Sequence, residues 1–241
     1  MPASKRKNAA AGQKNMNMFY IVLAVVAVVG IGAIVYSMRG GSGGSMATEP
    51  LNLSLASADS LLNTAQGVTI GEQNAPVQVI VFSDFQCPGC GVWQRNIETN
   101  LKPEFVESGK VRYTYYDYPI ISIHAHAFLA ARAARCANDQ GRFWDYHDRL
   151  FAGQNQWGFA RSAPVDQFTA YATELGLDAN AFTQCLRSER HADVVTANAL
   201  LGEQLGVRGT PTVFVGQRRL GDNEWSDYAA VSAAIEAAGG V

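Results

Sequence analysis

Residues 77–90 read VQVIVFSDFQCPGC and hold the most informative pattern of the 241-residue chain. Val77 to Phe82 is an apolar run with β-branched residues, which predicts a buried strand. Cys87 stands directly before Pro88, and proline suits the first turn of a helix because its missing N–H would be unpaired there anyway. We therefore expect a strand, a turn, and a helix from about Pro88 to Leu101 with Cys87 at its start.

Cys87 and Cys90 form a CxxC pair, which is the strongest chemical signal in the chain. Two cysteines three positions apart at a helix start can close a small disulfide while the first stays exposed. Cys87, at the positive end of the helix macrodipole, should have a stabilised thiolate, and Cys90 should be less accessible. A thiol of low pKa leaves a mixed disulfide readily, which favours passing the disulfide on to a substrate.

The pattern on either side of this pair predicts an α/β fold. Val111 to Tyr118 alternates like a second strand, and strand signals return at Thr212 to Val215, before a last helix at about Trp225 to Ala238. Between them the periodicity is helical, with predicted helices at His124–Ala137, Phe143–Phe151, Pro164–Leu175 and Ala179–Leu205. A β-α-β half and a β-α half thus flank an all-helical insertion.

Cys136 and Cys185 fall on apolar faces of two of these predicted helices. Two buried free cysteines are one interpretation. If Cys87 pairs with Cys90 and the chain is exported, a structural disulfide between Cys136 and Cys185 is the other, and we favour it.

The N-terminal region predicts a membrane anchor. Residues 16–38 contain no charge, and about 20 apolar residues span a bilayer core. Lys5, Arg6, Lys7 and Lys14 precede this segment while only Arg39 follows it closely, so residues 1–15 should form a cytoplasmic tail and the rest should lie outside. A cleaved signal peptide is the alternative, but the segment continues into Tyr36-Ser37-Met38-Arg39 without a small-x-small site. Residues 39–66 should form a flexible linker and lead-in, since Gly40 to Ser45 is a Gly/Ser run.

The amino-acid composition of the chain limits the classes of function that it supports. Apolar residues make up 48% and charged residues 17% of the chain, as in a folded protein. The net charge of −2 and the lack of a dense basic stripe in the globular part give nucleic-acid binding little support.

Zinc binding is a competing role for the CxxC, and a structural disulfide that takes no part in exchange is another. A structural zinc site normally takes four ligands, and the sequence has no second CxxC. His124 and His126 have a strand-like spacing in helical surroundings, which argues against a ligand role. We expect neither a metal nor a cofactor.

From about Gly67 to its end, the chain resembles the DsbA family, especially its membrane-anchored bacterial members. The likeness is carried by Phe85-Gln86-Cys87-Pro88-Gly89-Cys90, Ala134-Arg135-Cys136-Ala137, Gln140-Gly141-Arg142-Phe143-Trp144 and Gly209-Thr210-Pro211-Thr212. It implies a thioredoxin-like domain over residues 67–241 with a helical insertion at about 120–206. It also implies that Cys87 is the nucleophile and Cys90 its partner, that Pro88 and Gly89 tune the potential, and that Pro211 is a cis-proline preceded by a substrate-contacting Thr210.

The same resemblance implies a thiol:disulfide oxidoreductase that introduces disulfides into reduced exported proteins outside the cytoplasm, in the periplasm or at the cell surface. A DsbB-like or VKOR-like membrane partner would reoxidise it. A disulfide reductase or isomerase, and a tethered binding or chaperone module with a structural CxxC, remain alternatives.

The chain departs from the best-known family member in two places. Pro88-Gly89 stands where that member has Pro-His, which removes a histidine that could favour the thiolate. Val81 replaces an acidic residue on the strand, so Asp84 is the nearest carboxylate, either as an aid to proton transfer or as a plain turn residue.

Overall fold

The computed structural model describes residues 46–53 and 57–239. All described elements belong to the second of two compact units, Gly44–Val241. The predicted cytoplasmic tail (1–15), the predicted anchor (16–38) and the Gly/Ser run lie outside the described residues. Within the part that is described, no helix is both long and apolar enough to cross a membrane.

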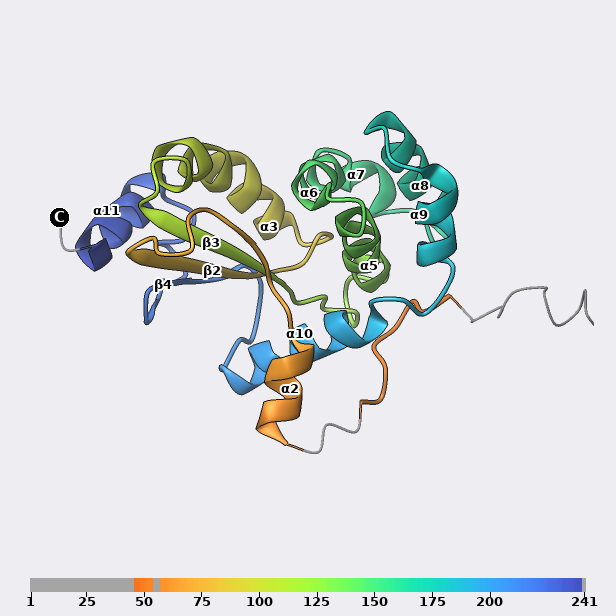
Figure 1. The fold of residues 1–241 in the computed structure, drawn as a ribbon, viewed down its shortest axis with the longest axis horizontal. Coiled ribbons are helices and arrows are strands. Elements are labelled where there is room, and N and C mark those ends of the chain that lie inside the picture. The colour runs from red at the N-terminus through yellow and green to blue at the C-terminus, as the bar shows by residue number, and fades with distance from the viewer. Residues whose placement is uncertain (1–45, 54–56, 240–241) are drawn as a thin grey trace, which may run out of the picture. The chain divides into compact units, whose positions relative to one another are not determined.

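A five-stranded sheet in the order β1-β3-β2-β4-β5 forms the centre of the fold (Figure 1). Its strands are β1 (Val68–Ile70), β2 (Val77–Ser83), β3 (Val111–Asp117), β4 (Thr212–Val215) and β5 (Arg218–Arg219). β2 and β3 are parallel, and the other pairs are antiparallel. The strands predicted at 77–82, 111–118 and 212–215 are confirmed, whereas the short edge strands β1 and β5 were not predicted.

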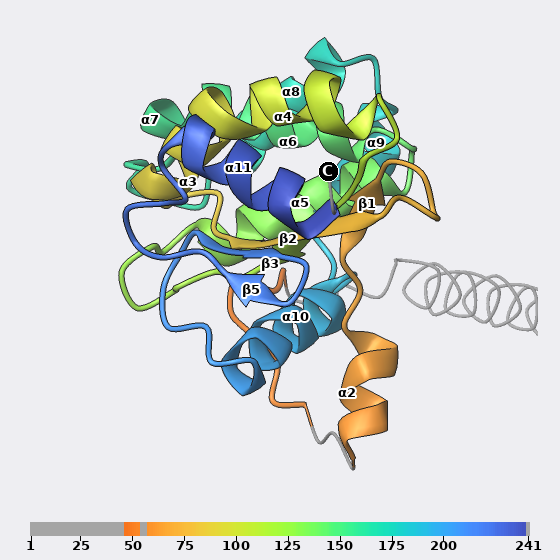
Figure 2. The same ribbon diagram turned by 90° about the vertical axis from the view of Figure 1, so that its left-hand side faces the viewer.

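Helices cover both faces of the sheet. After β2 the chain runs through α3 (Pro88–Trp93), two π-helical stretches η1 (Gln94–Glu98) and η2 (Lys102–Val106), and the intervening α4 (Thr99–Leu101). Figures 1 and 2 show α3 and α4 on one face together with α11 (Tyr228–Gly239), and α2 (Ala58–Thr64) and α10 (Ala192–Gln204) on the other. This βαβ unit and the closing β4-α11 segment make the fold thioredoxin-like.

The remaining helices form the insertion between β3 and α10. They are α5 (Ala127–Asn138), α6 (Phe143–Ala152), α7 (Gln154–Trp157), α8 (Val165–Glu174) and α9 (Ala179–Leu186). They pack on one another beside the sheet, and the N-terminal end of α3 points towards them (Figure 1). The predicted α/β architecture with a helical insertion is therefore confirmed.

The single helix predicted over Ala179–Leu205 was wrong, because the chain breaks between α9 and α10. His191 there has a left-handed backbone, with φ 65°. The buried guanidinium of Arg132 donates hydrogen bonds to the carbonyls of Cys185, Leu186, Ser188 and Arg190, which holds the break, and to Ala47. The part after the break packs on the sheet, where Gly202 is required because a Cβ there would lie 2.7 Å from the ring of Tyr118.

A buried ion pair joins the insertion to the sheet. Asp117 Oδ2, at the end of β3, accepts hydrogen bonds from Arg135 Nε of α5 at 2.8 Å and from Arg135 Nη2 at 2.5 Å. Asn198 Nδ2 of α10 donates to the same oxygen at 3.0 Å. A buried pair of this kind is destabilising to break, since the remaining charge would be left uncompensated. The insertion is therefore held at one position against the carboxyl end of the sheet.

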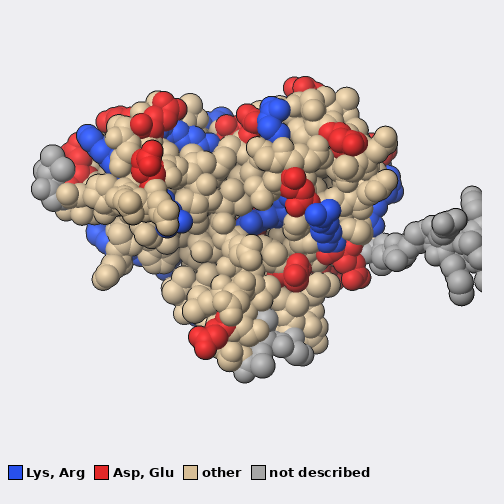
Figure 3. Space-filling model, in the orientation of Figure 1, with Lys and Arg blue, Asp and Glu red and all other residues tan. Residues whose placement is uncertain are grey.

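Charges are mixed on the face of the molecule that Figure 3 draws. Acidic and basic side chains are interspersed there, and uncharged atoms cover most of the middle. This distribution agrees with the formal net charge of −2.

Candidate active site

The CxxC lies at the carboxyl end of β2, where the sheet meets the helical insertion. Cys87 is the N-cap of α3 and Pro88 occupies the first turn, as the sequence predicted. The structure has both cysteines as free thiols. Cys87 is half-buried and Cys90 is completely buried. Only the first sulfur is therefore open to a substrate.

The surroundings of the two sulfurs shift the pKa values of the two thiols in opposite directions. The pKa of Cys87 is lowered to about 6, chiefly by the hydrogen bond from the Cys90 thiol, with further hydrogen bonds from Thr210 and the Cys90 backbone N–H; burial and the Asp84 charge oppose this. Burial raises the pKa of Cys90 well above its ordinary value, and the neighbouring Cys87 raises it further. At neutral pH the reduced pair thus holds one thiolate, on the accessible side, and one thiol.

A second loop, before β4, faces Cys87. The Thr210–Pro211 peptide bond is cis. Cys87 Sγ lies 3.3 Å from the carbonyl oxygen of Thr210, whose hydroxyl group is buried. A Cβ built on Gly89 would lie 3.3 Å from Pro211 Cδ. The structure therefore brings together Cys87, Gly89, Thr210 and Pro211, which the family resemblance had assigned to one site.

Two glutamines that were given no role of their own from the sequence connect the CxxC turn to the insertion. Gln154 Nε2, from α7, donates to the carbonyl oxygens of Phe85 at 2.7 Å and Cys87 at 2.9 Å. Gln86 Nε2 donates to the Gly158 carbonyl at 2.6 Å. These contacts join residues about 70 positions apart, and no local pattern indicates them.

Asp84 is fully buried directly behind the CxxC. Its carboxylate accepts hydrogen bonds from the backbone N–H groups of Gln86 at 2.7 Å and Ile120 at 2.8 Å, and its Oδ2 lies 2.8 Å from His124 Nδ1. Its own backbone N–H points to Cys90 Sγ at 3.4 Å. Asp84 therefore caps the strand-end turn and also contacts the redox pair.

A pocket of about 410 Å³ opens beside Pro88, between the CxxC turn and the insertion. His124, Gln154 and Gly158 contribute to its lining, and the exposed apolar side chains of Ile123 and Phe159 lie at it. The two residues on either side of Cys87 therefore border a pocket that carries exposed apolar side chains.

Comparisons with known proteins agree with this geometry. The family model described as "Thioredoxin" matches residues 63–237. The chain belongs to this family. The chain is also similar to proteins named for disulfide bond formation, and its fold, with the helical insertion, is that of solved DsbA-like structures.

Two relatives illustrate the likeness. The probable disulfide bond formation protein D of Bacillus anthracis is 25% identical over 203 residues, covering 81% of this chain and 85% of that protein. The crystal structure of BdbD from Bacillus subtilis has a TM-score of 0.64 and 23% identity, covering 73% of this chain and 97% of that one.

A more similar sequence belongs to a much longer protein. The Na(+)/H(+) antiporter NhaA 3 of Salinispora tropica is 36% identical over 149 residues, which is 62% of this chain. The match covers only 21% of the antiporter, so this DsbA-like chain spans about a fifth of the length of that relative.

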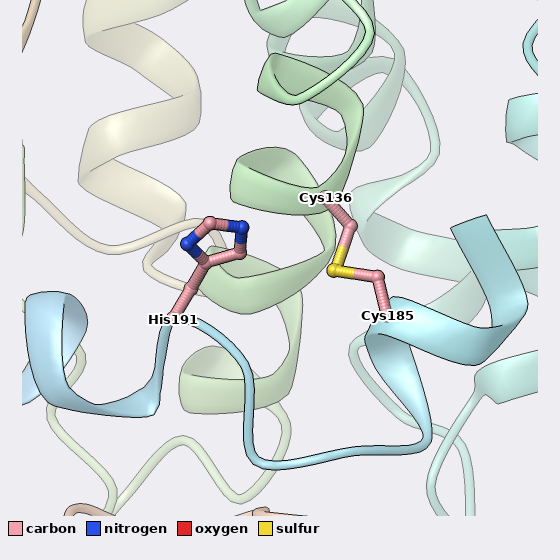
Figure 4. Close-up of side chains that lie close together, drawn as sticks. All are labelled: Cys136, Cys185 and His191. Carbon is pink, nitrogen blue, oxygen red and sulfur yellow. A yellow bond between two sulfur atoms is a disulfide. The ribbon is translucent and has the colours of Figure 1, made fainter. Parts of the chain in front are cut away.

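The other two cysteines of the DsbA-like chain lie in the insertion. Cys136 of α5 and Cys185 of α9 form a disulfide with a Cα–Cα distance of 5.9 Å (Figure 4). His191 lies beside it, with Nε2 2.9 Å from Asp139 Oδ2. These groups lie close enough together for a metal site, but sulfurs joined in a disulfide are not thiolate ligands.

A second group of ligand-type side chains, Glu98, His147 and Asp148, surrounds a cation that the chain itself supplies. Lys102 Nζ lies 2.6 Å from Glu98 and 3.5 Å from Asp148. The ammonium group therefore already supplies the positive charge that these carboxylates attract.

Proposed function

We propose that this chain is a membrane-anchored oxidoreductase that introduces disulfides into reduced proteins exported from the cytoplasm. The observation that carries the proposal is the asymmetry of the pair: Cys87 is accessible with its pKa lowered to about 6, and Cys90 is buried with its pKa raised. Stabilising one thiolate stabilises the reduced enzyme, which makes the oxidised enzyme a stronger oxidant.

The exchange takes two steps. A substrate thiolate attacks Cys87 Sγ of the oxidised pair, the Cys87–Cys90 bond breaks, and the Cys90 sulfur takes up a proton. A second thiolate of the substrate then attacks the substrate sulfur of the mixed disulfide and expels Cys87 as a thiolate. The substrate loses two electrons and gains a disulfide, while the enzyme pair is reduced.

The cis Thr210–Pro211 loop and the pocket beside Pro88 would bind the substrate chain on either side of Cys87. An extended segment could place its cysteine at Cys87 and pair its backbone with that of Thr210. Reoxidation would fall to a membrane protein of the DsbB-like or VKOR-like kind. Residues 67–241 would be the catalytic domain, tethered by residues 39–66 to an anchor at 16–38.

The direction of exchange is tested by the reduction potential. Equilibration with glutathione buffers, followed by alkylation, should give a potential above roughly −200 mV, and the oxidised protein should oxidise a reduced two-cysteine peptide in repeated turnovers with an added oxidant. A potential at or below roughly −270 mV, the thioredoxin value, would instead identify a reductant. Failure to exchange with any thiol would leave only a structural role for the CxxC.

The predicted topology is tested by protease accessibility. In spheroplasts, added protease should remove an epitope placed at the C-terminus and leave one placed within residues 1–15 intact, because the positive-inside rule puts that tail in the cytoplasm. Disruption of the membrane should expose both epitopes. Recovery of a soluble mature chain that begins after Arg39 would contradict the anchor.

A further inference from the structure

A negative charge close to Cys87, that of Asp84, disfavours the Cys87 thiolate on which the exchange reaction depends. The Asp84 carboxylate is buried, and its negative charge raises the pKa of both Cys87 and Cys90. Pro88 and Gly89, between the cysteines, carry no charge that could offset it. A buried carboxylate without a counter-charge is costly in itself and would also disfavour the thiolate.

One basic side chain reaches this carboxylate. In the described part of the chain, His124 is the only His, Lys or Arg within ion-pair distance of Asp84, with Nδ1 2.8 Å from Oδ2. The other groups that contact the carboxylate are the neutral backbone N–H groups of Gln86 and Ile120. The His124 side chain is only 14% exposed, so solvent screens the pair weakly.

His124 also lies close to the CxxC turn, since it lines the same pocket as Pro88. It is on the loop between β3 and α5. The hydrogen bond with Asp84 raises the pKa of His124 above its ordinary value, and the charges of Asp84 and Cys87 raise it further, against the effect of burial. The imidazolium thus borders the same pocket as Pro88, the residue next to Cys87, and a thiolate on Cys87 exists only in the reduced protein.

We propose that His124 is a positioning residue of the redox site, whose imidazolium neutralises Asp84 and favours the Cys87 thiolate over the disulfide. This inference rests on the proposed function, because it explains how the pair is made oxidising. A positive charge that interacts with the reduced state alone shifts the equilibrium towards reduced enzyme. If the His124–Asp84 pair had only a structural role, it would hold the loop against the CxxC turn and leave the equilibrium between oxidised and reduced enzyme unchanged.

His124→Gln tests the proposal because glutamine retains a hydrogen-bond donor and removes the charge. The equilibrium constant for reduction by glutathione at pH 7 should fall roughly threefold or more, a size typical of residues in one ion-pair network. The pH at which Cys87 becomes half-reactive towards iodoacetamide should rise with it. His126→Gln is the matched control: it lies on the same loop, but its ring contacts the neutral Ala160 carbonyl at 2.8 Å, so both values should stay as in the wild type.

Asp84→Asn separates the charge effect from a loss of packing. Without Asp84 the imidazole loses the partner that keeps it protonated, so adding His124→Gln to Asp84→Asn should change the glutathione equilibrium by less than about half as much, on a logarithmic scale, as His124→Gln alone. Equal effects in the two backgrounds would show that His124 acts without the pair.

A measurement on the unmodified protein needs no variant to fold. Because linkage is reciprocal, the His124 imidazole, followed by NMR, should titrate at a higher pH in the reduced protein than in the oxidised one. Equal titration in the two redox states, together with an unchanged glutathione equilibrium in His124→Gln, would overturn the proposal. Neither readout uses a protein substrate. If the wild-type protein equilibrates with glutathione but does not oxidise peptides, the proposed function is refuted and the proposal for His124 is not.

Discussion

Cys87→Ser should reduce peptide oxidation to the rate of the mixture without enzyme, because serine offers no sulfur for the substrate thiolate to attack. Cys90→Ala should also stop turnover but for a different reason. It leaves Cys87 accessible, and if Cys87 is first activated as a mixed disulfide with glutathione, it can still exchange with one peptide thiol. Non-reducing mass spectrometry should then find enzyme–peptide disulfide with Cys90→Ala and none with Cys87→Ser.

The pair of variants serves as its own control, since each removes one sulfur from the same turn. If mixed disulfide accumulated through Cys90 in Cys87→Ser, the assignment of roles would be reversed. That outcome would conflict with the complete burial of Cys90.

The same assignment predicts the pH dependence of the reduced enzyme. The pKa of Cys87 is depressed from 9.0 to about 6, so this group stabilises the reduced fold fully above the unfolded pKa of 9 and loses that contribution as the pH falls through about 6. Alkylation of the Cys90→Ala variant should have its midpoint at a higher pH than the wild type, because the hydrogen bond from Cys90 is the largest cause of the depression.

Local patterns were sufficient to predict the parts of the fold that depend on near neighbours. The alternation and apolar runs of 77–82 and 111–118 indicate strands because each such residue meets the core directly. The break between α9 and α10 escaped this reasoning, since the side chain that holds it, Arg132, lies more than 50 positions away. β5 is a two-residue pairing on the sheet edge with almost no pattern of its own.

The residues of the candidate site also divide into those that the local sequence indicates and those that depend on contacts with distant parts of the chain. Cys87, Cys90 and Pro88 could be assigned from one hexapeptide and the rules for helix starts. Thr210 and Pro211 required a family resemblance, because nothing local shows that two loops 123 positions apart meet at one sulfur. His124 was considered only as a zinc ligand, and its contact with Asp84, 40 positions away, becomes visible only in the folded chain.

The largest stability effect should come from the disulfide in the insertion. It closes a loop of 49 positions between Cys136 and Cys185, for which the chain-entropy model gives about 4 kcal/mol. In a Cys87→Ala/Cys90→Ala background, so that no other cysteine is redox-active, adding Cys136→Ala/Cys185→Ala should lower the free energy of urea unfolding by about that amount. Treating the background protein with dithiothreitol should give a similar loss, which separates the cross-link from the packing of the two side chains.

With Cys87 and Cys90 intact, the same pair of alanines should leave the glutathione equilibrium of the CxxC unchanged, because the bond lies in the insertion and away from both sulfurs. A loss of less than about 1 kcal/mol would mean that the buried packing of α5 against α9, rather than the cross-link, holds the insertion together.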